Sequence, residues 1–255
     1  ASGKLLAGGA LTLTSIGLDN TAGQASGASV VIDASASALS SIGGTIGSSA
    51  GTLSIRSGTL NNDAGRLQSA GDLSIDTQGQ ALSNGQAGSY QGLGDQRHGA
   101  GQGGISSTGV MTVRAGALDN TGGFIGSQGD AAIVAGGVTN QAGLIASNSA
   151  LGLDVQGSTF DNRGGQTQAG GNLGINANRI DNSGALIRSA GAASLTSASL
   201  ANRDTQAANQ GIEAAGLAVA AGQVGNTHGA IRSSRDAALS SGGTVDNTAG
   251  LISAV

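Results

Sequence analysis

The chain has 255 residues, a formal net charge of −4 at pH 7, 48 glycines, and neither proline nor cysteine. Glycine without a strict triplet period and without proline excludes collagen, and a content of 38% hydrophobic and 10% charged residues disfavours disorder. The missing cysteine excludes disulfides and cysteine-ligated metals. The few basic residues form no stripe, so nucleic acid is not an expected partner.

A motif of the form apolar–x–Asn recurs along the whole chain. Successive motifs are 20 to 24 residues apart, except for one longer interval between Asn84 and Asn120. Self-similarity at such a period indicates a repeat architecture. Leu39-Ser-Ser41 is a degenerate copy in the expected place. The asparagines are Asn20, Asn62, Asn84, Asn120, Asn140, Asn162, Asn182, Asn202, Asn226 and Asn247.

Short alternating strands are predicted between these motifs. Each copy offers one such strand and a second apolar position five residues after the asparagine corner. In the copy around residue 120, the expected inward residues are Leu118, Ile125, Ala131 and Ile133. The alternating runs lie at 11–13, 30–32, 53–55, 73–75, 111–113, 131–133, 151–153, 173–175, 193–195, 217–219 and 237–239.

One copy is too small to bury a core, but stacked copies share one. The corners are also too short for helical crossovers, so each copy is expected to wind one level above the last. The sequence therefore predicts an all-β, right-handed parallel β-helix of about eleven turns, forming a single domain over residues 1–255. The many glycines are expected to supply positive φ at its corners.

Two stretches depart from the period, at about 85–107 and 203–210. Both are expected to leave a corner as loops. The longer one carries Tyr90, Asp95, Arg97 and His98, which are candidate contacts for a partner because binding residues often lie on loops of a rigid scaffold. The alternative is a loop that is merely tolerated, since lengthening a surface loop costs little entropy.

The recurring asparagines could form a row of ligands or a structural ladder, and we expect the ladder, because stacked amides bond one another at turns. The neighbouring aspartates do not form the calcium-binding nonapeptide, so neither a metal nor a cofactor is expected. His228 is expected at an exposed corner. Phe160 is expected in the core, and Phe124, beside an inward position, is a candidate for the outer face.

The stretch from Leu118 to Ile125, Leu-Asp-Asn-Thr-Gly-Gly-Phe-Ile, followed by Ser and Gly and an alternating strand, resembles the haemagglutinin repeats of filamentous haemagglutinins. It is similar also to the stalks of contact-dependent growth inhibition effectors. The resemblance implies a virulence-associated exoprotein that leaves a Gram-negative cell by two-partner (type V) secretion through an outer-membrane transporter. Such a rod stays at the cell surface or is secreted, where it adheres or carries a C-terminal toxin outward. Neither a secretion domain nor a toxin module is visible, and the chain is expected to be a middle segment of a longer rod.

Three hypotheses follow. One is a stalk that binds a receptor or glycan on a target cell or presents a toxin. Another is a passive scaffold without a ligand. The remaining one is a carbohydrate-active β-helix, either a polysaccharide lyase or a hydrolase. Such enzymes need a groove of acids, bases and aromatic platforms, whereas this chain has Lys4 as its single lysine and three aromatic residues, so no enzyme is expected. Uncovered strand edges at the two ends predict end-to-end self-association.

Overall fold

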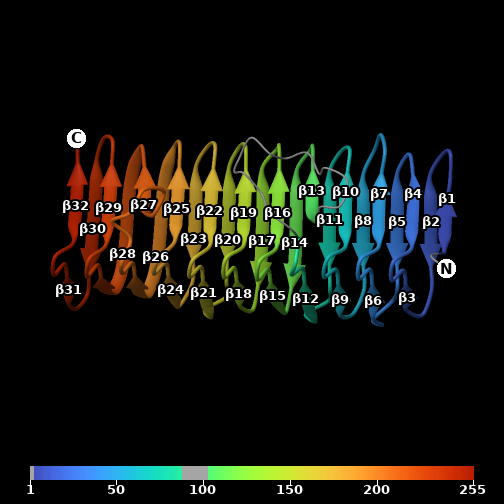
Figure 1. Cartoon of the computed structure of the whole chain (residues 1–255), viewed down its shortest axis with the longest axis horizontal. Helices are drawn as coiled ribbons and strands as arrows, with labels where there is room; N and C mark the ends of the chain where they lie inside the picture. Colours follow the sequence, from blue (N-terminus) through green and yellow to red (C-terminus); the bar gives the residue numbers. More distant parts are fainter. Residues whose placement is uncertain (1–2, 88–102) are drawn as a thin grey trace.

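The computed structural model describes residues 3–87 and 103–255, and it is a parallel β-solenoid of about eleven turns with a repeat of about 21 residues. Figure 1 shows the turns side by side along a straight rod, with the two ends of the chain at opposite ends of the rod. The predicted all-β parallel β-helix is confirmed, while its right-handed sense of winding stays a prediction. At about 4.8 Å per level, the rod is roughly 50 Å long.

Each turn contributes one strand to each of three rows. Row A is a 12-stranded sheet that follows the asparagine corners. It consists of β1 (Lys4–Leu6), β4 (Gln24–Gly27), β7 (Thr45–Ser48), β10 (Arg66–Ser69), β13 (Gly104–Ser107), β16 (Phe124–Ser127), β19 (Leu144–Ser147), β22 (Gln166–Ala169), β25 (Leu186–Ser189), β27 (Gly211–Ala214), β29 (Ala230–Ser233) and β32 (Leu251–Ala254).

Rows B and C together form a 20-stranded sheet, because two long strands, β26 and β28, run through both rows. Row B consists of β2 (Leu11–Thr14), β5 (Val30–Asp33), β8 (Leu53–Arg56), β11 (Leu73–Asp76), β14 (Met111–Ala115), β17 (Ala131–Ala135), β20 (Leu151–Asp154), β23 (Leu173–Asn176), β26 (Ala192–Ala201), β28 (Gly216–Gly225) and β30 (Ala237–Ser241). Row C precedes the corners and adds β3 (Leu18–Asp19), β6 (Leu39–Ser40), β9 (Leu60–Asn61), β12 (Ala81–Ser83), β15 (Ala117–Asp119), β18 (Val138–Thr139), β21 (Thr159–Asp161), β24 (Arg179–Asp181) and β31 (Val245–Asp246).

Like residues stack on like residues from one turn to the next. In row A, Ile125 pairs in register with Ile145, twenty residues on. In row B, Ile133 pairs with Leu153. The four residues expected to point inward from this turn are all at most 4% exposed, and they belong to one core that runs along the rod. In row B, alternation along the strand therefore decides which side chains are buried, as the sequence predicts.

Phe124 and Phe160 lie in different clusters. Phe160 is part of the main core, as expected. Phe124 alternates with inward Ile125 and is 1% exposed, in a second small cluster with Ala87, Leu144 and Ala146. A Cβ at Gly126 would lie 2.4 Å from the Cζ atom of Phe124, so the ring occupies the space that this glycine leaves open. Row A thus has an apolar patch on its outer side as well as its inner side.

The register locates the two irregular stretches. Row A passes from Arg66 to Gly104 in one level, a step of 38 residues, and from Leu186 to Gly211, a step of 25. The regular winding has resumed by Gly104, inside the range expected for the longer insertion. In the part of the chain that the structure describes, no helix is long and apolar enough to cross a membrane.

Candidate functional site

The recurring asparagine side chains form a column inside the corners. Those from Asn62 to Asn226 are fully buried, and each donates from Nδ2 to Oδ1 of the asparagine one level on, at 2.7–2.8 Å. The same nitrogen also donates to a row A carbonyl of the next turn, as from Asn162 to Leu186 O at 3.0 Å. Both Nδ2 donors are therefore used within the column, and none is left for a ligand.

The column is interrupted where the sequence has serine. Asn20 Nδ2 donates to Ser41 Oγ at 3.3 Å, but the serine side chain is too short to reach the next member. Asn62 Oδ1 is consequently without a partner, and no other buried side-chain nitrogen or oxygen in the described residues lacks one. A buried acceptor without a donor reduces stability.

The corner backbone uses two adjacent positions in different ways. Two residues after the asparagine φ is positive, and this position holds alanine at Ala64 (φ 53°) and Ala142 (φ 50°) as well as glycine. One residue later comes a glycine such as Gly143, where an added Cβ would lie 2.2 Å from Asn120 O. The expectation that corner glycines serve positive φ is thus wrong for this second position. Here glycine is needed because the neighbouring turn approaches closely.

A second column, of serines, ends the row A strands. These hydroxyls are buried and hold the corner that leads to row B: Ser69 Oγ donates to Asp72 O at 2.7 Å, and Ser127 Oγ to Gly129 O at 2.6 Å. Ser147 Oγ reaches back one level to Gly129 O at 2.8 Å. The sequence analysis did not identify this column, although a serine recurs at the fourth residue of most row A strands. The buried members are Ser48, Ser69, Ser107, Ser127, Ser147, Ser189 and Ser233.

The aspartates before the asparagines cap the corners from outside. Asp119 Oδ1 accepts a hydrogen bond from the amide of Thr121 at 2.9 Å, an Asx-turn. Partial burial alone would raise the pKa of Asp181, but hydrogen bonds from Ser183 and from the Arg179 guanidinium outweigh it and hold that pKa below its ordinary value. Among the described residues no group of three or more His, Asp or Glu side chains is placed to hold a metal ion.

Of the candidate partner contacts, Tyr90, Asp95, Arg97 and His98 lie outside the described residues. His228 is exposed, and its Nδ1 lies 3.8 Å from Asp204 Oδ1.

The shorter insertion, residues 203–210, lies across several corners. Gln210 Nε2 donates to Gly184 O at 3.1 Å, Thr205 Oγ1 accepts from the amide of Ala230 at 3.0 Å, and Gln206 Nε2 donates to Ala249 O at 2.6 Å. These contacts join turns up to three levels apart. This segment is therefore a brace rather than a free loop.

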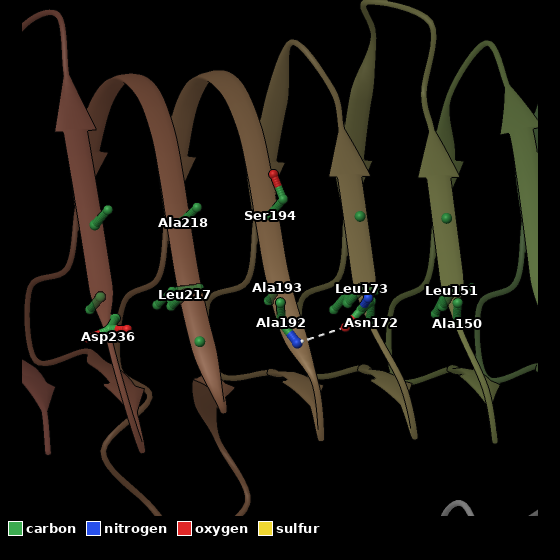
Figure 2. Close-up of a pocket in the computed structure, with 15 residues that line it drawn as sticks. Ala150, Leu151, Asn172, Leu173, Ala192, Ala193, Ser194, Leu217, Ala218 and Asp236 are labelled. Carbon is green, nitrogen blue, oxygen red and sulfur yellow. Dashed lines mark hydrogen bonds between the residues drawn. The ribbon is translucent and has the colours of Figure 1, made fainter.

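A groove lies on the outer side of row B, with a volume of about 660 Å³. Figure 2 shows it crossing neighbouring strands, with small side chains such as Ala218 on its floor. Asn172 and Asp236 lie at its edge, and Asn172 Oδ1 accepts a hydrogen bond from the amide of Ala192 at 3.0 Å. The floor carries no converging polar groups that would orient a small substrate.

The model of the haemagglutinin repeat family matches residues 1–46, 32–86, 99–157, 133–212 and 207–249. No curated protein and no solved structure gives a match. Together the matched segments cover most of the winding described above. This repeat is typically a structural, non-catalytic unit of exoproteins that are secreted or displayed at the surface. The chain therefore belongs to the haemagglutinin repeat family, as found in filamentous-haemagglutinin-like exoproteins.

Proposed function

We propose that this chain is a stalk segment of a secreted or surface-displayed exoprotein of a Gram-negative bacterium, exported through an outer-membrane two-partner secretion transporter. The stalk holds an adhesive or toxic module at a distance from the cell that makes it. The observation that carries this proposal is the asparagine column, which runs unbroken from Asn62 to Asn247 in the described turns. A continuous internal column and core make a stiff rod whose length is set by the number of turns.

The outer face of row B supports a spacer better than an enzyme. A glycoside hydrolase of the common type needs two carboxyl groups on either side of the scissile bond. Two hollows on row B have small, apolar floors and one carboxylate each, Asp236 in one and Asp154 in the other. Neither hollow supplies the second carboxyl group.

Removing one whole turn tests the spacer. Residues 131 to 150 form one turn, because Ala131 pairs in register with Leu151. Their deletion should shorten the rod by about 4.8 Å and keep the winding. In the exoprotein that contains this segment, we expect secretion and adhesion or toxin delivery to continue.

Deleting only residues 131 to 140 is the matched control. It removes half a turn and puts inward side chains on the outside, so the chain should fail to fold. If removal of the whole turn instead abolishes adhesion or delivery by a folded, displayed protein, this segment recognises the target itself and the spacer proposal is wrong.

A further inference from the structure

The residue before each corner asparagine lies on the outer side of row C, because the apolar residue before it points into the core. These outward residues stack in register from turn to turn, and many of them are aspartates. We call this series the aspartate column. From the turn of residue 119 onward, its members are Asp119, Thr139, Asp161, Asp181, Ala201, Gly225 and Asp246.

The aspartate column has a gap of two levels. Ala201 and Gly225 carry no polar side chain, whereas Asp181 lies one level before them and Asp246 one level after. Three levels separate the backbones of these two aspartates, about 14 Å. Turns of the same chain thus border the gap on both sides.

The arginine at this gap lacks the partner that its counterpart has. Arg163 donates from Nε and Nη2 to the two carboxylate oxygens of Asp161, at 2.9 and 2.7 Å. Arg203 occupies the same corner position two levels on, and in both corners the next residue has positive φ, 63° and 55°. Its own corner has Ala201 in place of the aspartate. Within the described residues, the Arg203 guanidinium makes no hydrogen bond and no ion pair, and it is exposed.

The Arg203 guanidinium faces the gap. A Cβ built on Gly225 would lie 3.3 Å from both Nε and Nη2 of Arg203, the two atoms that Arg163 uses to hold Asp161. The amide of Arg163 also donates to Asp161 Oδ1, at 3.2 Å, whereas the equivalent amides of Arg203 and Thr227 have no acceptor in the described part of the chain. An arginine fork and two backbone N–H groups therefore remain beside the gap. Such donors are suited to a carboxylate.

The surface at the gap is hollowed, with a volume of about 430 Å³, which is in the range of ligand pockets. The two flanking aspartates and polar side chains such as Gln223 line this hollow. Asp246 accepts hydrogen bonds from the Thr248 amide at 3.0 Å and from Thr227 Oγ1 at 2.9 Å. A carboxylate accepts about four hydrogen bonds, so Asp246 can accept more. The middle of the hollow thus suits one carboxylate, and its edges suit hydroxyl donors.

We propose that this hollow binds a carboxylated sugar, a hexuronic acid residue of a polysaccharide. The sugar carboxylate takes the place of the missing aspartate side chain and accepts hydrogen bonds from Nε and Nη2 of Arg203. Its ring hydroxyls donate to Asp181 and Asp246. A neutral sugar leaves the arginine unpaired, and a run of acidic side chains is repelled by the two aspartates. Residues 131 to 150, whose deletion tests the spacer, do not line the hollow, so the two proposals are tested separately.

A titration followed by the amide signals of the 255-residue chain in nuclear magnetic resonance tests the ligand class. The probes are methyl glucuronide and methyl glucoside, which differ only by a carboxylate in place of a hydroxymethyl group. We expect the glucuronide to shift the amide signals of Arg203, Gly225 and Thr227, and the glucoside to leave them in place. Equal shifts with both sugars, or no shift with the glucuronide, would overturn the proposal. Equally tight binding of a capped aspartate would show that the site recognises a carboxylate without the sugar, and would overturn it as well.

Two variants and a control test the residues. Arg203→Ala should weaken glucuronide binding at least about tenfold, because it removes the charged donors. Arg163→Ala removes the same charge from the paired corner and should leave the affinity unchanged. Ala201→Asp supplies the missing carboxylate from the chain itself, so it should abolish binding without lowering the melting temperature. Equal affinity of the Arg203→Ala and Arg163→Ala variants would refute the site, whether or not the Ala201→Asp variant folds.

Discussion

Removal of one asparagine from the middle of the column measures what the column contributes. In Asn162→Ala, the Nδ2 of Asn140 loses its acceptor at 2.7 Å but keeps Gln166 O at 3.0 Å. Asn182 Oδ1 loses its donor at 2.8 Å and becomes a buried acceptor without a partner, and the bonds from Thr167 Oγ1 and to Leu186 O are lost too. One orphaned buried group costs about 1–3 kcal/mol. We therefore expect a loss of about 2 kcal/mol, or roughly 4–8 °C in melting temperature for a chain of this size.

The control is Asn176→Ala, the same chemical change on the outer side of row B. Asn176 is exposed and donates to Asp154 Oδ1 at 3.2 Å, a surface contact of little energetic value. Urea unfolding followed by far-ultraviolet circular dichroism compares both variants with the unsubstituted chain. If Asn162→Ala unfolds together with Asn176→Ala, the amide column makes no net contribution and the reasoning fails.

Three further predictions concern the stability of the fold. Ser41→Asn supplies the donor that Asn62 Oδ1 lacks, so it should raise stability by about 1 kcal/mol, and lower stability would show that the corner has no room. Ala142→Gly relieves a positive φ, so it should raise the free energy of unfolding by about 1 kcal/mol. Gly143→Ala, one residue on, should lower the free energy of unfolding by about 1–3 kcal/mol, because its Cβ meets a carbonyl of the neighbouring turn. Because the folded state lowers the pKa of Asp181, the stability it contributes is present above about pH 4 and is lost as the pH falls through the lowered pKa. In Asp181→Asn the melting temperature should therefore fall less steeply as the pH is lowered. If the melting temperature of this variant falls in acid as steeply as that of the unsubstituted chain, Asp181 does not make this contribution to stability.

The winding and the core were predictable because both depend on spacing alone. A period of about 21 residues requires each turn to lie on the last, and alternation within a strand then sends Ile133 inward. The asparagine positions follow from the same register, and each of the ten lies where the repeats require it. Handedness does not follow from spacing, and it stays a prediction.

Other features depend on neighbouring turns, which the sequence of one turn does not reveal. Gly143 is required by a carbonyl twenty-three residues earlier along the chain, that of Asn120, rather than by its own φ. The serine column was missed because a serine between polar corner residues has the pattern of an exposed loop. Phe124 was correctly assigned as a candidate for the outer face, but its burial depends on packing that alternation cannot predict.

The direction of the hydrogen bonds has a mechanical consequence. They lie along the rod, so tension applied at its two ends separates one turn at a time. Each turn that unfolds replaces about 4.8 Å of rod with roughly 70 Å of extended chain. A stalk of this kind lengthens under load instead of transmitting a sudden pull to whatever it holds. Residues 203–210 change this response near the C-terminal end, because Gln206 and Gln210 bind turns three levels apart. Turns joined in this way must separate together, and a force–extension trace would record their release as one larger step.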